Sequence, residues 1–312
     1  MMKHILNIAL VALLLLACGN NRAAQNAAAA EAKPAVDTLA DLELPLPVLP
    51  ATLTDPSARA AYIIEHYWDA MDFRDTLRSH NIDFVEQNFA NFVSVFPYAD
   101  AQSQRNAAGR LLDCAKVDKE AYLLVAETAE KYLYDPNSPM LSEDYYMLFL
   151  EHLASSPVLD EYETVRYVWQ LDAAKKNRPG MRAADFSYVT PEGRRRTLRE
   201  TPCGSELLLI FYDPDCGHCK EIITALTEER LLNEMTANGR ITVLAVHSGE
   251  QKSLWEETAS QLPAGWLKGY ESGLLQESGA YVLRAMPTIY LLNSRKEVVL
   301  KDVLPEQLMY YL

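Results

Sequence analysis

The chain has 312 residues, of which 49% are hydrophobic, and this length and composition suit two modest globular domains. Its 29 Lys and Arg residues against 43 Asp and Glu residues give a formal net charge of −14. Because phosphate binding requires clustered Lys and Arg, this balance argues against a nucleic-acid partner. The one short basic cluster, at residues 194–196, is expected to be a solvated turn.

The N-terminus has the pattern of an export signal. A short basic stretch precedes an apolar run over residues 5–17, which is too short to span a bilayer as a helix. The run ends in LLAC, which resembles the bacterial lipobox; the alternative is an ordinary signal peptide followed by a chance cysteine. The resemblance implies that residues 1–17 are a removed signal peptide and that lipid attached to Cys18 holds the protein at a membrane. Gly19 favours the outer membrane by resemblance to sorting rules, so we expect a lipoprotein of the cell envelope that faces the periplasm.

Two regions follow the predicted signal. Residues 18–50 are rich in Ala and Pro without a periodic apolar face, which predicts a flexible tether. Residues 51–176 repeat apolar side chains at helical spacing and predict an all-α domain of about six helices, whose aromatic residues we expect in the core. After a start at Asp55-Pro56-Ser57, the helices are expected at about residues 82–96, 103–115, 117–134, 142–154 and 159–176.

Residues 177–312 have a different pattern. Strands are predicted at residues 185–189, 207–212, 241–246, 288–292 and 297–300. Helices are predicted at residues 219–238, 250–261 and 305–312. This alternation, which closes with an antiparallel hairpin and a helix, predicts an α/β domain with a mixed sheet.

The motif CGHC, from Cys216 to Cys219, lies between a buried strand and a helix. A helix N-terminus presents unpaired N–H groups and the positive end of the macrodipole, and both favour a thiolate, the nucleophile of disulfide exchange. We therefore expect Cys216 to attack and Cys219, one turn later, to resolve the mixed disulfide. A protonated His218 would add to this stabilisation, although it is also explained as a solvated helix residue. The Gly-His pair is similar to that of disulfide isomerases and predicts a reduction potential of roughly −220 mV or higher.

A C-x-x-C motif alone also fits half of a zinc site or a structural disulfide. Zinc requires four ligands, or three and a water, but the sequence has no second Cys pair and His247 is the only other histidine nearby. We therefore expect neither a metal nor an organic cofactor. Of the remaining cysteines, Cys114 and Cys203 either bridge the two domains or are unrelated thiols.

Two segments resemble the thioredoxin superfamily. Residues 211–220, FYDPDCGHCK, resemble its active-site segment, and residues 285–291, AMPTIYL, resemble its cis-proline signature. The spacing of 71 residues from Cys216 to Pro287, with a strand and turn before the motif, resembles the TlpA/ResA subgroup of envelope thioredoxins. The resemblance implies a thioredoxin-like fold over residues 178–312, a cis Pro287 packed against the sulfurs, and substrate binding at Gly217 and at the backbone of Met286. The alternative is a trans proline at the start of a strand.

The match has departures. The family usually has Trp immediately before the first cysteine and often an acid or Asn six residues before it, whereas this chain has Asp215 and Ile210. Carboxylates at Asp213 or Asp215 would oppose a thiolate on Cys216. Glu277 is a candidate to reach the site from the stretch before Pro287. The helical region resembles a domain of unknown function that precedes thioredoxin-like domains in Bacteroidetes lipoproteins.

These features predict a thiol–disulfide oxidoreductase that exchanges disulfides with envelope proteins through Cys216 and Cys219 and passes electrons to or from a membrane redox partner. The alternative is a lipid-anchored binding or assembly protein that uses the thioredoxin fold as a scaffold, because a fold alone does not establish function.

Overall fold

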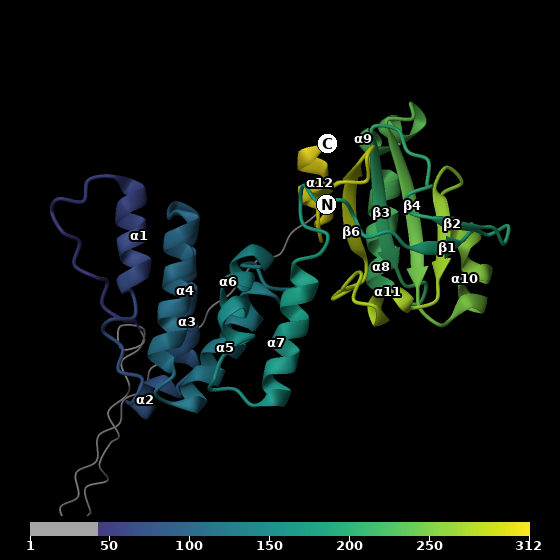
Figure 1. Cartoon of the computed structure of the whole chain (residues 1–312). Helices are drawn as coiled ribbons and strands as arrows, with labels where there is room; N and C mark the ends of the chain where they lie inside the picture. Colours follow the sequence, from purple (N-terminus) through teal and green to yellow (C-terminus); the bar gives the residue numbers. More distant parts are fainter. Residues whose placement is uncertain (1–42) are drawn as a thin grey trace, which may run out of the picture. The chain divides into compact units, whose positions relative to one another are not determined.

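The computed structural model describes residues 43–312, which fall in one compact unit (Figure 1). Helices fill the first part of this unit and a sheet with flanking helices fills the second part. The predicted signal peptide, the lipid-attachment residue Cys18 and the tether up to residue 42 lie outside the described residues.

The first part is all-α, as the sequence predicts. Its six longer helices each contain 11 to 15 residues: α1 (Pro56–His66), α3 (Ile82–Ser94), α4 (Ala101–Ala115), α5 (Lys119–Leu133), α6 (Glu143–Leu153) and α7 (Glu161–Ala174). A short helix, α2 (Thr76–Ser79), and a 3-10 turn (Phe96–Tyr98) complete it. Each longer helix begins after an Asp, Asn or Ser whose side chain accepts a backbone N–H of the first turn, which satisfies a donor that the helix itself leaves unpaired.

Aromatic side chains make up much of the helical core, as predicted. Phe89 and Phe149 are fully buried, with their ring centroids 5.4 Å apart. Trp169 is an exception, since it is 48% exposed on α7. Leu44 is also buried and donates its backbone N–H to the side chain of Asn88 at 2.8 Å. The packed region therefore begins before the end of the predicted tether at residue 50.

The second part contains a seven-stranded mixed sheet with the order β2-β1-β5-β4-β3-β6-β7. Its strands are β1 (Ser187–Val189), β2 (Arg195–Thr197), β3 (Glu206–Tyr212), β4 (Ile241–Ser248), β5 (Leu267–Glu271), β6 (Thr288–Asn293) and β7 (Val298–Leu300). Strand β3 pairs in parallel with β4 and antiparallel with β6. This mixed sheet with flanking helices confirms the predicted α/β class.

Strand β3 is buried on both faces. Leu208 and Ile210 point into one core, and Leu207, Leu209 and Phe211 point into the other. This alternation follows from the two-residue period of a strand. Helices cover the sheet on both sides (Figure 1): α8 (Gly217–Glu228), α9 (Arg230–Ala237), α10 (Lys252–Thr258), α11 (Leu274–Glu277) and α12 (Pro305–Tyr311).

Three features differ from the sequence-based expectation. The predicted helix at residues 219–238 is two helices, because Glu229 has an extended backbone between α8 and α9. Strand β5 was not expected, since Lys268 and Gly269 interrupt its apolar pattern. The basic residues Arg195 and Arg196 lie in β2, which pairs with β1, and not in a solvated turn.

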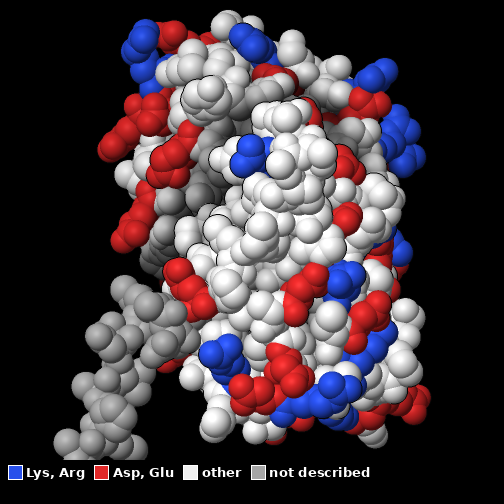
Figure 2. Space-filling view, turned by 90° about the vertical axis from the view of Figure 1, so that its left-hand side faces the viewer, with Lys and Arg blue, Asp and Glu red and all other residues white. Residues whose placement is uncertain are grey.

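The surface on the side of α1 is uneven in charge. Figure 2 shows acidic and basic side chains around its margins and a largely uncharged centre. Within the described part of the chain, no helix combines the length and apolar character needed to span a bilayer.

Candidate active site

The CGHC motif lies where β3 ends and α8 begins. A tight turn joins the two elements, in which the Cys216 N–H donates to the Asp213 carbonyl at 3.2 Å and the Asp215 N–H donates to the Asp213 carboxylate at 2.8 Å. Cys216 is the N-cap residue of α8. The turn therefore places the first sulfur at the positive end of the helix, as the sequence predicts.

The Cys216 sulfur contacts a backbone group of α8 and one of the loop before β6. It accepts the N–H of Cys219 at 3.2 Å, and its thiol faces the carbonyl oxygen of Met286 at 3.7 Å. Cys216 is partly exposed. An attacking sulfur needs this combination of fixed position and access.

The Cys219 sulfur lies behind the first and is inaccessible. Cys219 is fully buried, and its sulfur accepts the N–H of Asp213 at 3.5 Å. Burial, with a smaller contribution from the adjacent Cys216, raises the pKa of Cys219 to about 12. Cys219 is therefore a neutral thiol near neutral pH, which suits a group that reacts second.

The peptide bond between Met286 and Pro287 is cis, as the resemblance implies. It immediately precedes β6, the antiparallel neighbour of β3. The pairing of these strands brings the Met286 carbonyl to the Cys216 sulfur across 70 positions of sequence.

The residues between the cysteines point outward. His218 is exposed, and its nearest charged partner is Glu221 at 3.7 Å. No hydrogen bond joins His218 to either sulfur among the described residues, so any influence on Cys216 is electrostatic and acts through space. Gly217 is also exposed, and a Cβ placed there would meet no atom within 4 Å. This open space is compatible with the predicted approach of a substrate chain.

Among the described residues, no hydrogen bond joins the other candidates, Glu277 and His247, to either sulfur. Glu277 is exposed on α11 and lines a cavity bounded by Phe186 and Tyr188, which does not include either cysteine. His247 is buried in β4, where its Nδ1 lies 3.2 Å from the Tyr212 carbonyl. Across residues 43–312 there is no group of three or more His, Cys, Asp or Glu side chains arranged to hold a metal ion.

The sequence did not indicate the backbone N–H of Asp213 as the partner of the Cys219 sulfur. A main-chain contact of this kind has no residue-type signal, because every residue other than proline offers the same N–H.

Cys114 and Cys203 are separate free thiols in this structure. Cys114 packs against the helical core, where burial raises its pKa. Cys203 packs against a core of the sheet region, and the ammonium of Lys296 donates to its sulfur at 2.9 Å. The structure therefore fits the alternative of two unrelated thiols.

Comparison with known proteins places both regions. The family model "Domain of unknown function (DUF5106)" matches residues 17–177. A crystal structure of a thioredoxin-like protein from Bacteroides caccae is 33% identical, covers 86% of this chain and 96% of its own, and superposes with a TM-score of 0.79. The chain belongs to the family of thioredoxin-like proteins with a DUF5106 domain. Its helical region is the DUF5106 domain, and its C-terminal region is the thioredoxin-like domain.

Other structures match a smaller share of the chain. A conserved protein of unknown function from Bacteroides fragilis is 39% identical over 43% of this chain and 98% of its own, with a TM-score of 0.42. A domain of a possible thiol-disulfide isomerase from Cytophaga hutchinsonii is 23% identical over 44% of this chain and 92% of its own, with a TM-score of 0.39. No curated protein matches the chain.

Proposed function

We propose that this DUF5106 protein is a thiol–disulfide oxidoreductase that acts on protein thiols and disulfides of the cell envelope through Cys216 and Cys219. One observation carries the proposal. A partly exposed sulfur at a helix N-terminus lies directly in front of a buried sulfur whose pKa is raised to about 12. This asymmetry separates an attacking thiol from a resolving thiol.

In the reductive direction, the Cys216 thiolate attacks one sulfur of a substrate disulfide. A new S–S bond forms between Cys216 and the substrate, and the second substrate sulfur leaves as a thiolate that takes up a proton. Cys219 then loses its proton and attacks the Cys216 sulfur, which releases the first substrate sulfur. Two electrons pass to the substrate, and a Cys216–Cys219 disulfide remains. The reverse sequence oxidises a substrate dithiol.

The backbone around the sulfurs supports these steps. The Cys219 N–H donates to the Cys216 sulfur at 3.2 Å and stabilises its negative charge. The Met286 carbonyl lies 3.7 Å from the same sulfur, and a substrate backbone would bind beside this segment. The open space at Gly217 leaves room for the substrate chain.

The test is reduction of insulin disulfides by the protein with a chemical reductant as the electron source. The proposal expects Cys216→Ser to abolish turnover and Cys219→Ala to accumulate a mixed disulfide. Cys114→Ala and Cys203→Ser provide matched controls, because these thiols lie outside the CGHC site. Equal activity of Cys216→Ser and the wild-type protein would reject the proposal and leave the scaffold alternative.

The envelope location is part of the proposal. We infer that lipid on Cys18 anchors the protein at the outer membrane on its periplasmic side, where a membrane redox partner would restore the Cys216–Cys219 pair to its working state. The support is the LLAC sequence at residues 15–18. Fractionation of cells that express Cys18→Ala should move the protein from the membrane to the soluble fraction. Retention of this variant in the membrane would contradict the anchor.

A further inference from the structure

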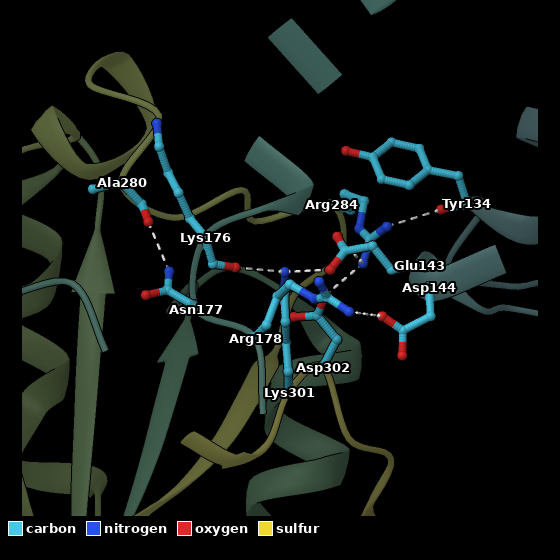
Figure 3. A network of polar contacts seen from close by, with 10 residues as sticks. All are labelled: Tyr134, Glu143, Asp144, Lys176, Asn177, Arg178, Ala280, Arg284, Lys301 and Asp302. Carbon is cyan, nitrogen blue, oxygen red and sulfur yellow. Dashed lines mark hydrogen bonds and ion pairs between the residues drawn. The ribbon is translucent and has the colours of Figure 1, made fainter. Parts of the chain in front are cut away.

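Residues 279–287, which include Met286 and Pro287, contact the DUF5106 domain at two points. The first point is the C-terminal end of that domain. Just after α7, the Lys176 ammonium donates to the Gly279 carbonyl at 3.0 Å. Figure 3 shows the next contact, in which the Asn177 side chain donates to the Ala280 carbonyl at 2.8 Å. Asn177 is buried and also accepts the Ala184 N–H at 2.8 Å. The beginning of the segment is therefore fixed to the end of the helical domain.

Arg284 provides the second point. Its guanidinium lies 4.2 Å above the ring of Tyr134 and donates to the Tyr134 carbonyl at 3.4 Å. On its other side it bonds the Asp302 carboxylate at 2.5 Å, and the Glu143 carboxylate lies 3.8 Å away. The Arg284 side chain is only 12% exposed. Arg284, two positions before Met286, therefore ties this part of the chain to the α5–α6 connection.

Lys301 follows β7 and lies outside residues 279–287, but it contacts the same Glu143 carboxylate. Its ammonium bonds the Glu143 carboxylate and donates to the Lys176 carbonyl at 3.1 Å. Two cations, Arg284 and Lys301, thus share two carboxylates, Glu143 and Asp302, at a site where each side chain is less than 20% exposed. Figure 3 shows the four groups converging between the two domains. Charges buried in this way depend on one another, since removal of one leaves another without a partner.

The position of this cluster matters because residues 280–287 belong to no helix or strand. Within this stretch, Tyr281 is buried and donates its hydroxyl to the Ala184 carbonyl at 2.7 Å, so the sheet region fixes the stretch together with the anchors to the DUF5106 domain. Only Ala285 separates Arg284 from Met286, and the Met286 carbonyl lies 3.7 Å from the Cys216 sulfur. A shift at Arg284 would therefore move the carbonyl that faces the attacking sulfur.

We propose that the DUF5106 domain positions the Met286–Pro287 segment beside Cys216. Arg284 is the positioning residue, because its contacts with Tyr134, Glu143 and Asp302 connect that domain to the segment. The domain then acts as part of the substrate site of the thioredoxin-like domain, although none of its residues touches the sulfurs. The catalytic consequence of this inference rests on the proposed oxidoreductase function; the structural consequence does not.

The experiment compares Arg284→Met with Arg284→Lys in the chain from residue 19 onward. Arg178→Met is the matched control, because Arg178 bonds Asp144 at 2.7 Å in the same interface but is 42% exposed. Two properties are measured: the steady-state constants for reduction of a disulfide-containing peptide, and hydrogen–deuterium exchange of the amides at residues 282–286.

For Arg284→Met, we expect KM for the peptide to rise about tenfold with kcat within about twofold. The amides at residues 282–286 should exchange at least about tenfold faster than in the wild-type protein. Arg284→Lys keeps the charge, so its KM and its exchange rates should be close to those of the wild-type protein. Arg178→Met should match the wild type in both measurements. A purely structural role would lower the melting temperature without this change in KM.

If Arg284→Met has the KM of the wild-type protein and the same rates of amide hydrogen–deuterium exchange at residues 282–286, the proposal is overturned. If Arg284→Met does not fold, Glu143→Gln decides by the same readouts: faster exchange at residues 282–286 supports the proposal, and unchanged exchange rejects it. If the wild-type protein does not reduce the disulfide of the peptide, the oxidoreductase function is rejected. The hydrogen–deuterium measurement would still test whether Arg284 holds the segment in place.

Discussion

The buried sulfur of Cys219 allows a quantitative prediction. Burial raises its pKa from an ordinary value of 9.0 to about 12, so at pH 8 it holds roughly a thousandfold less thiolate than a free cysteine. A thiolate of higher pKa is more nucleophilic. With a Brønsted slope of about 0.45, the rate constant of the thiolate rises roughly twentyfold over this shift in pKa. A Cys216→Ser variant keeps the burial that is the main cause of the raised pKa and loses the smaller contribution of Cys216, so Cys219 should react with iodoacetamide up to about 40-fold more slowly than free cysteine, before burial slows it further.

The assay follows alkylation by mass spectrometry in a chain from residue 19 onward that also carries Cys114→Ala and Cys203→Ala, so that Cys219 is the thiol being labelled. The same variant unfolded in guanidinium is the control. Because the pKa is raised, the thiolate forms only at high pH, and the rate should climb about tenfold per pH unit from pH 8 to 10. A free thiol levels off near pH 9. A folded rate within about threefold of the unfolded rate, or a plateau near pH 9, would refute the reasoning.

Three further outcomes follow from packing and from the motif. Phe89→Ala, in the helical core, should lower the free energy of unfolding by about 3–5 kcal/mol in denaturant titrations, whereas Tyr162→Ala, at a residue 91% exposed, should change it by less than about 0.5 kcal/mol. Gly269→Ala should cost about 1–3 kcal/mol, because the added Cβ would lie 2.7 Å from the Tyr188 ring; unchanged stability would contradict this packing. Equilibration with glutathione should give the CGHC pair a potential of roughly −220 mV or higher, and a value below roughly −270 mV would contradict the role assigned to the Gly-His pair.

Much of the fold follows from local sequence patterns. The apolar run at residues 207–212 predicts a strand buried on both faces, and β3 fulfils this because its side chains alternate between two cores. The CGHC motif after this run places the sulfurs at a strand-to-helix junction, which the structure confirms at Cys216. Strand β5 escaped prediction because its β-structure comes from pairing with β4 and not from its own composition.

Contacts between distant segments were not predictable. Leu44 lies in an Ala- and Pro-rich stretch, and only its packing near Asn88 brings it into the folded region. Glu143 has the sequence pattern of an ordinary first-turn acid of a helix, yet in the structure it balances the charges of Arg284 and Lys301. An ion pair formed by tertiary structure leaves no periodic pattern in the chain, so the link between the DUF5106 domain and Met286 became visible only with the fold.

The most direct test of the central claim is to locate the first bond formed with a substrate. Cys219→Ala is mixed with a disulfide-containing peptide, the reaction is stopped with acid, and the adduct is mapped by peptide mass spectrometry. We predict a stable mixed disulfide on Cys216, at close to one peptide per chain, and none on Cys114 or Cys203. Failure to form this adduct on Cys216, or its formation mainly on another cysteine, would contradict the account.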